Sequence, residues 1–407
     1  MAGPLDGIRV VELASWMFVP SGGSILADWG ADVLKIENPD GGDPQRGLIT
    51  SGLVPGGAGG VNFMIEQPNR GKRSIAINLT NADGHELFMK IIETSDVLMT
   101  NYLPPILRKL NLTPEDIRAR NANIIIARGS GQGPMGPDAE KGGYDGASFW
   151  ARGGMGAVFP ENSEGWPASQ GSPAFGDVMG GLATAGAIAA ALVKRDRTGE
   201  PSIVDVSLLA TAMWQLSPLV IASRLFGMGK LPSGADRRQS PNPGVGTYRT
   251  RDNRFISLIL LQSDRHWEEF AERIERPELL TDPRFRDSTA RAANSGPCID
   301  VLDEAFGART LDEWKTRLAD FSGVWCPYQT LDELYDDPQV IANGYLPTMD
   351  HANGERVQLV ASPAQFDEEP IAVTRAPELG EHTELFLHEL GIAWDDIAAM
   401  KEGGAIL

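Results

Sequence analysis

The stretch from Gly7 to Glu37, GIRVVELASWMFVPSGGSILADWGADVLKIE, decides the fold of this chain. Residues 7–13 form a short apolar run typical of a buried strand, and residues 22–31 have the composition of a short helix that leads to a second strand at residues 31–37. A strand, a helix and a strand in this order pair in parallel through a right-handed crossover. The connection ASWMFVPSGG contains no G-x-G-x-x-G motif, which argues against a nicotinamide dinucleotide site.

The same alternation continues beyond this unit. It predicts strands within residues 69–79, 96–105 and 123–128, and helices at residues 81–95 and from Thr113, where a capping residue, a proline and two acids follow in the order of a helix start. Such an alternation specifies an open, mostly parallel α/β sheet.

Ligands of open parallel sheets bind beyond the carboxyl ends of the strands. We therefore expect a site formed by the loops that begin at Ala14, Asn101 and Gly129. The third loop, residues 129–166, is long, glycine-rich and poor in regular pattern, and a loop of this length in a compact domain is usually functional.

A slim helix with one acid at its start follows, within residues 171–209. Asp177 precedes an uncharged run at residues 178–193 that consists largely of glycine and alanine, and basic residues come before Gly199 at the other end. Small side chains allow a neighbouring backbone or a ligand to approach closely. Asp177 lies where the helix dipole favours an ionised carboxylate. From this pattern alone, Asp177 is either a helix N-cap or a functional acid.

Composition limits the classes of protein. The 407 residues are enough for two buried cores, and 42% are hydrophobic, as in soluble globular proteins. We see no signal peptide and expect a cytoplasmic protein; two cysteines fit a reducing compartment. With 36 basic and 55 acidic residues, the net charge of −19 argues against nucleic acid or a membrane as a partner. One basic cluster, Arg70, Lys72 and Arg73, is either a phosphate contact or a solvated strand entry.

The sequence texture predicts the domain organisation. Residues 1–224 carry the strand and helix alternation, whereas residues 225–328 begin with a turn-rich linker and continue with short elements of their own pattern. We expect the first segment to form a large α/β domain, the second a small domain, and residues 329–407 to return to the large domain.

Histidine placement excludes several catalytic devices. None of the five histidines, at positions 85, 266, 351, 382 and 388, lies near Asp177 in the sequence, and there is no G-x-S-x-G nucleophile elbow. No residue spacing suggests a metal site. A carboxylate nucleophile remains, and carboxylates attack thioesters or phosphates rather than amides.

The chain also resembles the class III CoA-transferases of the CaiB/BaiF type, which include formyl-CoA:oxalate and carnitine CoA-transferases and have 2-methylacyl-CoA racemases as relatives. The resemblance spans nearly the whole length, in the order of the family. It rests on PLDGIRVVEL, LADWGADVLKIENPDGGDPQRG, NRGKRSIAINL, TNYLPPILRKLNL, IIIARGSGQGPMGP, GGYD, the Asp177 helix with KRDRTGEPSIVDVSL, and APELGEHTELFLHELG. It implies a large Rossmann-like domain built from both chain ends, a small inserted α+β domain, and a homodimer of two interlocked chains.

The resemblance also implies a site and a reaction. Asp177 matches the family's catalytic aspartate, which forms a mixed anhydride with the donor acyl group and then a thioester with coenzyme A, before an acceptor carboxylate takes the CoA. No metal is implied. The implied CoA-binding residues are Met17, Phe18, Asn38, Ile77, Asn78, Leu79, Thr80, Asn101, Tyr102, Leu103, Arg108, Lys109, Gly142, Gly143 and Tyr144.

Some positions depart from the pattern of the oxalate enzyme. Met17, Asn38 and Thr80 stand where that enzyme has glutamine, arginine and lysine, and residues 258–264 contain no glycine-rich loop, which argues against an oxalate-like acceptor. A racemase would have a histidine at position 144, where this chain has a tyrosine, a poor proton exchanger at neutral pH. A racemase or isomerase and a CoA-binding homologue without catalysis remain the alternatives to a CoA-transferase.

Overall fold

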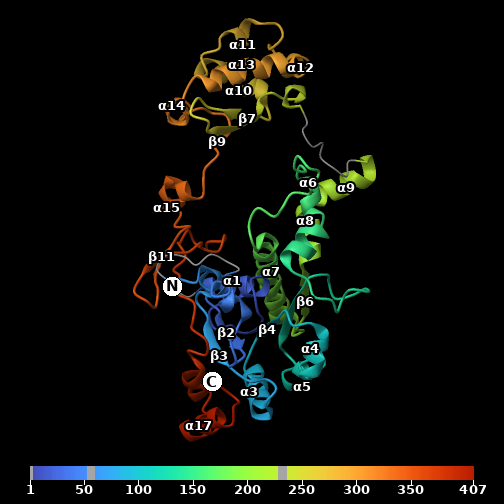
Figure 1. Ribbon diagram of the computed structural model, residues 1–407, viewed down its shortest axis with the longest axis vertical. Helices are drawn as coiled ribbons and strands as arrows, with labels where there is room; N and C mark the ends of the chain where they lie inside the picture. The colour runs from blue at the N-terminus through green and yellow to red at the C-terminus, as the bar shows by residue number, and fades with distance from the viewer. Residues whose placement is uncertain (1–2, 53–59, 228–235) are drawn as a thin grey trace. The chain divides into compact units, whose positions relative to one another are not determined.

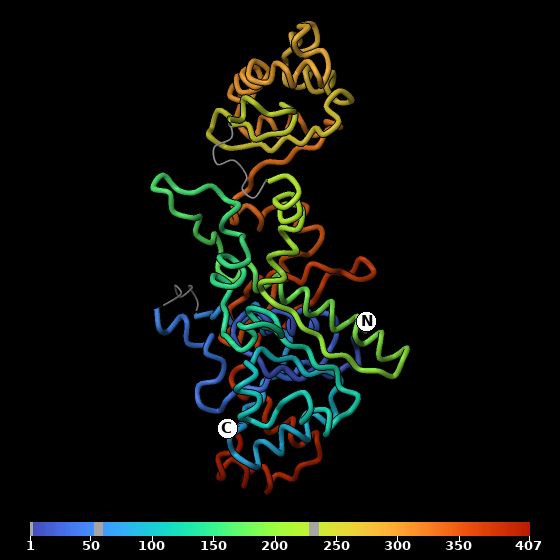
Figure 2. Tube along the Cα trace, turned by 90° about the vertical axis from the view of Figure 1, so that its right-hand side faces the viewer, coloured from blue at the N-terminus to red at the C-terminus, as the bar shows by residue number. Residues whose placement is uncertain are grey.

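The computed structural model describes residues 3–52, 60–227 and 236–407. The chain divides into two compact units (Figures 1 and 2). The large unit consists of Met1–Leu231 and Pro338–Leu407, so it contains both chain ends, and the small unit consists of Pro232–Asp337. Part of the expected turn-rich linker, at residues 228–235, lies outside the described residues.

A six-stranded parallel sheet forms the centre of the large unit, in the order β3-β2-β1-β4-β5-β6. All predicted strands of this sheet are confirmed, most of them shorter than the apolar runs that predicted them. The strands are β1 (Arg9–Leu13), β2 (Asp32–Glu37), β3 (Arg73–Ala76), β4 (Val97–Thr100), β5 (Ile125–Ser130) and β6 (Ile203–Ser207).

Helices cover both faces of this sheet, because successive strand residues point to opposite sides. Val10 packs into one core with α1 (Phe18–Asp28), α7 (Phe175–Thr198) and α8 (Leu208–Gln215). Val11 packs into the other core, whose helices are α3 (Ala82–Glu93), α5 (Pro114–Arg120), α16 (Thr383–Glu389) and α17 (Trp394–Glu402). The result is a doubly wound α/β arrangement.

Local signals explain where these helices begin and end. The predicted helix start at Thr113 is confirmed as a capping box, in which the Thr113 hydroxyl and the Asp116 carboxylate each accept a backbone hydrogen bond from the other residue. α7 ends at Thr198, and the next residue, Gly199, is its C-cap with a φ of 73°. α1 begins at Phe18, four residues before the predicted helix, because the bulky residues of MFVP form its first turn instead of a loop.

Glycines bring α1 and α7 into close contact. A Cβ atom added to Gly181 would lie 1.9 Å from Ser21 Oγ, and one added to Gly22 would lie 2.9 Å from the carbonyl oxygen of Gly181. The predicted slim helix thus packs backbone against backbone. By length and composition alone α7 is also apolar enough to cross a membrane, a property that it shares with core helices of soluble proteins.

The C-terminal segment contacts the edge of the sheet at β3. Residue Asn78, just beyond β3, donates its backbone N–H to the carbonyl oxygen of Ala405, at 2.8 Å, and Ile77 forms an antiparallel bridge with Ile406. In Figures 1 and 2 the red C-terminal helices lie beside α3. α16 lies within the stretch APELGEHTELFLHELG, on which the resemblance rests, and α17 follows it. Before these helices, the segment contains α15 (Pro338–Ala342) and a hairpin of β10 (Thr348–Asp350) and β11 (Arg356–Gln358).

The loop at residues 129–166 is more regular than its sequence predicted. It contains a short π-helix, η3 (Asp145–Ala151), and a single turn, α6 (Met155–Val158). Glycines at several positions hid the periodicity of these turns. The remaining elements of the large unit are η1 (Pro44–Gly47), α2 (Phe63–Asn69), α4 (Pro104–Lys109) and α9 (Ser217–Phe226).

The small unit has its own sheet and core. Three antiparallel strands, β7 (Val245–Arg249), β8 (Phe255–Ile259) and β9 (Trp325–Pro327), pack with helices around an aromatic core that includes Phe270 and Trp314. Residues 330–340, TLDELYDDPQV, form a separate turn, η5, followed by the start of α15. The other elements are η4 (Arg237–Gln239), α10 (Ser263–Arg273), α11 (Glu278–Thr281), α12 (Ser288–Ala293), α13 (Ser295–Gly307), α14 (Leu311–Arg317) and η5 (Asp332–Asp336).

Candidate active site

A pocket of about 310 Å³ lies at the carboxyl edge of the large sheet. The loops after β1, β4 and β5 line it, together with the first turns of α7 and α8. β1 and β4 are neighbours at the point where the strand order reverses, which is where doubly wound sheets bind ligands. The three loops expected to meet therefore do meet. The lining residues are Ser15, Trp16, Phe18, Pro44, Asn101, Tyr102, Leu103, Ile106, Gly129, Ser130, Gly131, Gly142, Gly143, Tyr144, Asp177 and Leu208.

Asp177 is the third residue of α7 and does not cap the helix. The N-cap position is Ala174, in a left-handed conformation with a φ of 60°, and no side chain of α7 caps this end. Among the described residues, none donates a hydrogen bond to the Asp177 carboxylate. Burial, and secondly the nearby charge of Asp145, raise the pKa of Asp177 to about 7. The helix dipole was expected to keep Asp177 ionised, but burial and the charge of Asp145 have the larger effect on its pKa.

Asp145 takes the capping role that the sequence offered to Asp177. Its Oδ1 accepts the backbone N–H of Gly176 at 2.9 Å, and its Oδ2 accepts a hydrogen bond from Gln170 Nε2. A Cβ atom at residue 176 would lie 2.5 Å from Asp145 Oδ1, so this contact requires a glycine. Burial raises the pKa of Asp145 despite these hydrogen bonds. The helix start is therefore satisfied from outside, and the Asp177 carboxylate is left available to a ligand.

Two aromatic side chains stand beside the two acids. Tyr144 is 66% exposed, and its ring meets that of Trp16 edge-on, with centroids 5.9 Å apart and an interplanar angle of 88°. Trp16 has a φ of 70°, a left-handed conformation that costs a bulky residue about 1–3 kcal/mol. Ser15 was not among the predicted site residues, and nothing in the sequence marks the left-handed backbone at Trp16.

The predicted CoA-binding residues occupy several places. Seven of them and Asp177 line the pocket described above. Tyr102 and Leu103 also line an adjoining pocket of about 290 Å³, which Arg108 reaches, and Leu79, Thr80 and Lys109 line a third depression of about 460 Å³. As the structure describes them, four predicted residues line none of these three: Met17, Asn38, Ile77 and Asn78.

The basic cluster before β3 serves neither of the two roles considered for it. Lys72 is fully buried and pairs with Glu12 at 2.7 Å. Arg70 pairs with Asp28, also at 2.7 Å. Arg73 pairs with Asp32 and with Glu389. The three cations therefore connect elements of the fold and are not available for a phosphate.

This fold and this pocket identify the class of protein. The chain belongs to CoA-transferase family III, whose family model matches residues 5–383. The resemblance noted in the sequence is thus confirmed. Within the part of the chain that the structure describes, no group of side chains is suited to hold a metal ion.

Individual relatives match over nearly the full length. The chain is 31% identical to (R)-2-hydroxy-4-methylpentanoate CoA-transferase of Clostridioides difficile, over 99% of each chain. It is 28% identical to cinnamoyl-CoA:phenyllactate CoA-transferase of Clostridium sporogenes, over 99% of this chain and 97% of that protein. A crystal structure of Rv3272 from Mycobacterium tuberculosis has a TM-score of 0.79 and 27% identity, and covers 95% of this chain and 99% of that one.

Proposed function

We propose that this protein transfers CoA from an acyl-CoA thioester to a carboxylic acid, with Asp177 as the nucleophile. The Asp177 carboxylate attacks the thioester carbonyl, the C–S bond breaks, and a mixed anhydride and the CoA thiolate form. The thiolate then attacks the aspartyl carbonyl, which releases the donor acid and leaves an aspartyl-CoA thioester. The acceptor carboxylate attacks this thioester, and the released thiolate takes the acyl group from the second anhydride, which restores Asp177.

One observation carries this proposal: a carboxylate that has no cationic partner among the described residues faces the pocket at the switch point of the sheet. Its pKa of about 7 leaves a large fraction ionised at neutral pH, and weak solvation makes that fraction a better nucleophile. No histidine lines the pocket among the described residues, so neither a serine–histidine device nor a histidine proton exchanger accompanies the acid. Tyr144 supports transfer over racemisation, because a tyrosine hydroxyl is a poor proton exchanger at neutral pH.

We place the CoA substrate across the pocket at Asp177, the pocket that adjoins it and the third depression at Lys109. The thioester end lies at Asp177 and Tyr144, and Arg108 and Lys109 supply positive charge for the phosphates. Arg108 currently pairs with Glu140 at 2.8 Å on the surface, a weak contact that a phosphate can replace. The roles of Met17, Asn38, Ile77 and Asn78 stay predictions from the resemblance.

We further propose that two chains form an interlocked homodimer and that the protein is cytoplasmic. Large apolar side chains on α8 and α9 are exposed, among them Trp214 at 80% and Phe226 at 73%. Large apolar side chains that are exposed together on neighbouring helices often mark a protein–protein contact. Light scattering should give twice the chain mass of 43.8 kDa, and two differently tagged preparations should not exchange subunits without unfolding. A monomer, or rapid exchange, would contradict the interlocked dimer.

Covalent trapping tests the catalytic proposal. Intact-protein mass spectrometry after mixing with CoA thioesters of branched 2-hydroxy acids and of aryl acids should show an acyl or CoA adduct, and hydroxylamine should convert it to a hydroxamate at Asp177. The Asp177→Asn variant should show neither. Absence of an adduct with every thioester would favour a CoA-binding homologue, and deuterium entering the α-carbon from solvent would favour a racemase.

A further inference from the structure

Trp16 is held in its left-handed conformation by side chains from distant parts of the chain. Its backbone N–H donates to Asp43 Oδ1 at 3.1 Å. The preceding residue, Ser15, is fixed on both sides by Asn101, whose Oδ1 accepts the Ser15 N–H at 3.1 Å and whose Nδ2 donates to the Ser15 carbonyl oxygen at 2.6 Å. The backbone strain at Trp16 persists because these contacts over-determine the loop.

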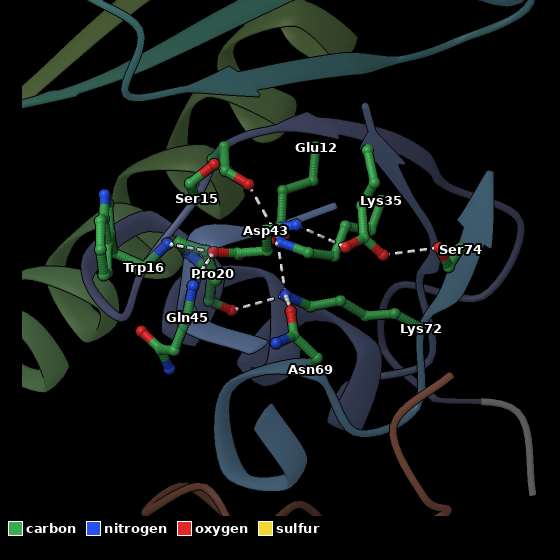
Figure 3. A network of polar contacts seen from close by, with 12 residues as sticks. Glu12, Ser15, Trp16, Pro20, Lys35, Asp43, Gln45, Asn69, Lys72 and Ser74 are labelled. Carbon is green, nitrogen blue, oxygen red and sulfur yellow. Dashed lines mark hydrogen bonds and ion pairs between the residues drawn. The ribbon is translucent and has the colours of Figure 1, made fainter. Parts of the chain in front are cut away.

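Asp43 is itself fixed by a buried network of charges (Figure 3). Its side chain is almost completely buried, and its Oδ2 pairs with Lys35 Nζ at 2.9 Å. Lys35 also donates to Glu12 Oε1, at 3.2 Å, and to the carbonyl oxygen of Ala14, at 3.0 Å. Glu12 in turn holds Lys72 at 2.7 Å. The network therefore fixes both the start of the loop and the carboxylate that binds Trp16.

The Trp16 indole is one of the large side chains that line the pocket. It is half-buried, lies against Tyr144, and lines the same pocket as Asp177. Four of the lining residues are glycines, at positions 129, 131, 142 and 143, and the other large lining side chains are those of Phe18, Tyr102, Leu103, Ile106, Tyr144 and Leu208. The buried charges position Trp16 through its backbone N–H, so they can set how far this side chain extends into the space open to an acyl group beside Asp177.

We propose that Trp16 determines the size of acyl group that the pocket accepts, and that Asp43 is a positioning residue that acts through Trp16. The proposal rests on the proposed function, because it assigns the acyl end of a CoA thioester to this pocket. In this proposal the buried charges do more than stabilise the fold, because they also set the position of the Trp16 side chain in the pocket.

Binding of unreactive probes tests this proposal independently of catalysis. S-methyl-, S-butyl- and S-octyl-CoA thioethers cannot form the aspartyl anhydride, and calorimetry gives a Kd for each. The measured quantity is the ratio of the S-octyl Kd to the S-methyl Kd, in which general effects on CoA binding cancel. Trp16→Ala should lower this ratio by about tenfold or more, because removing one bulky side chain from an acyl pocket changes discrimination by roughly that factor.

Asp43→Ala should lower the ratio in the same direction, and the Trp16→Ala/Asp43→Ala double variant should show no further change beyond Trp16→Ala. The matched control is Asp28→Ala, which removes a buried ion pair with Arg70 at 2.7 Å but does not touch the loop, and its ratio should equal that of the wild type. If Asp43→Ala does not fold, Asp43→Asn keeps an oxygen for the Trp16 N–H but loses the charge, and a change of about threefold is expected.

An unchanged ratio in folded Trp16→Ala protein would overturn the proposal, as would Asp43→Ala weakening all three probes equally. Failure of all thioethers to bind the wild type would overturn it as well. If the wild type transfers no CoA in any assay but still shows a Trp16-dependent ratio, the catalytic proposal fails and the assignment of Trp16 stands.

Discussion

Two groups of buried carboxylates lie close together in the large unit, and they differ in whether cations pair with them. Glu12 is paired with two lysines, at 3.2 and 2.7 Å. Burial alone would raise the pKa of Glu37, but hydrogen bonds from Arg46 and the charge of Lys35 lower it to about 2. Asp177 has no such partner in the part of the chain that the structure describes; burial and a second acid raise its pKa to about 7.

The difference separates charges that hold the fold from a charge that is available for chemistry. In the network, each carboxylate is matched by cations, and removing one partner would leave the other buried and unpaired. In the pocket, the ionised form is disfavoured and its solvation is left to a ligand. Glycines allow α1 to pack closely against α7, and this contact brings the buried charge network and Asp177 near each other in the fold.

The largest expected effect is loss of activity without the unpaired acid. Asp177→Asn should lower the rate of CoA transfer by on the order of 10³-fold or more, because the residue supplies the nucleophile. Steady-state kinetics with a thioester that traps on the wild type would measure this. Asp196→Asn, an exposed acid on the same helix, is the control and should retain the wild-type rate. Near-wild-type turnover in Asp177→Asn would show that the unpaired acid is not the nucleophile, and that it does not differ from the paired carboxylates in this respect.

The largest effect on stability should come from the paired group. Glu12→Gln leaves two buried lysines without their shared carboxylate and should lower the free energy of unfolding by about 3–5 kcal/mol. Urea denaturation measures it. Glu389→Gln breaks an ion pair with Arg73 in which Glu389 is 59% exposed, and it should cost less than about 1 kcal/mol. Equal losses in the two variants would show that the network does not hold the fold as argued.

The pH dependence of the reaction tests whether the ionised Asp177 carboxylate is the reacting group. Since the nucleophile is the ionised form, kcat/KM for the thioester should rise with pH through an apparent pKa near 7. Asp145→Asn removes the charge that helps to raise the pKa of Asp177 but keeps an oxygen for the Gly176 N–H. Its profile should therefore shift to lower pH. A profile that is flat between pH 5 and 9, or a shift to higher pH in Asp145→Asn, contradicts the assignment.

The sequence predicted the features that depend on local patterns, and it did not predict those that depend on contacts between distant residues. The strands, the parallel sheet and the loops at the site follow from local apolar runs and from the rules of parallel sheets. Asp177 was noticeable as a lone acid before a slim helix, but whether it caps the helix depended on Asp145, 32 residues earlier. The buried pairing of Lys72 and the contact of Asp43 with Trp16 join distant segments, and no local pattern encodes them.

The smallest expected effect is a gain in stability at the pocket. A carboxyl group whose pKa is about 7 in the fold, against an ordinary value of 3.8, makes the protein less stable as the pH rises from about 4 to 7, because the unfolded chain releases the proton first. Asp177→Asn removes this loss and should raise the free energy of unfolding by about 1–2 kcal/mol at pH 8 and by less at pH 5. Thermal unfolding at the two pH values measures the difference, with Asp196→Asn as the control. A destabilised Asp177→Asn at pH 8 would mean that the Asp177 carboxylate has a stabilising partner, as the carboxylates of the network do.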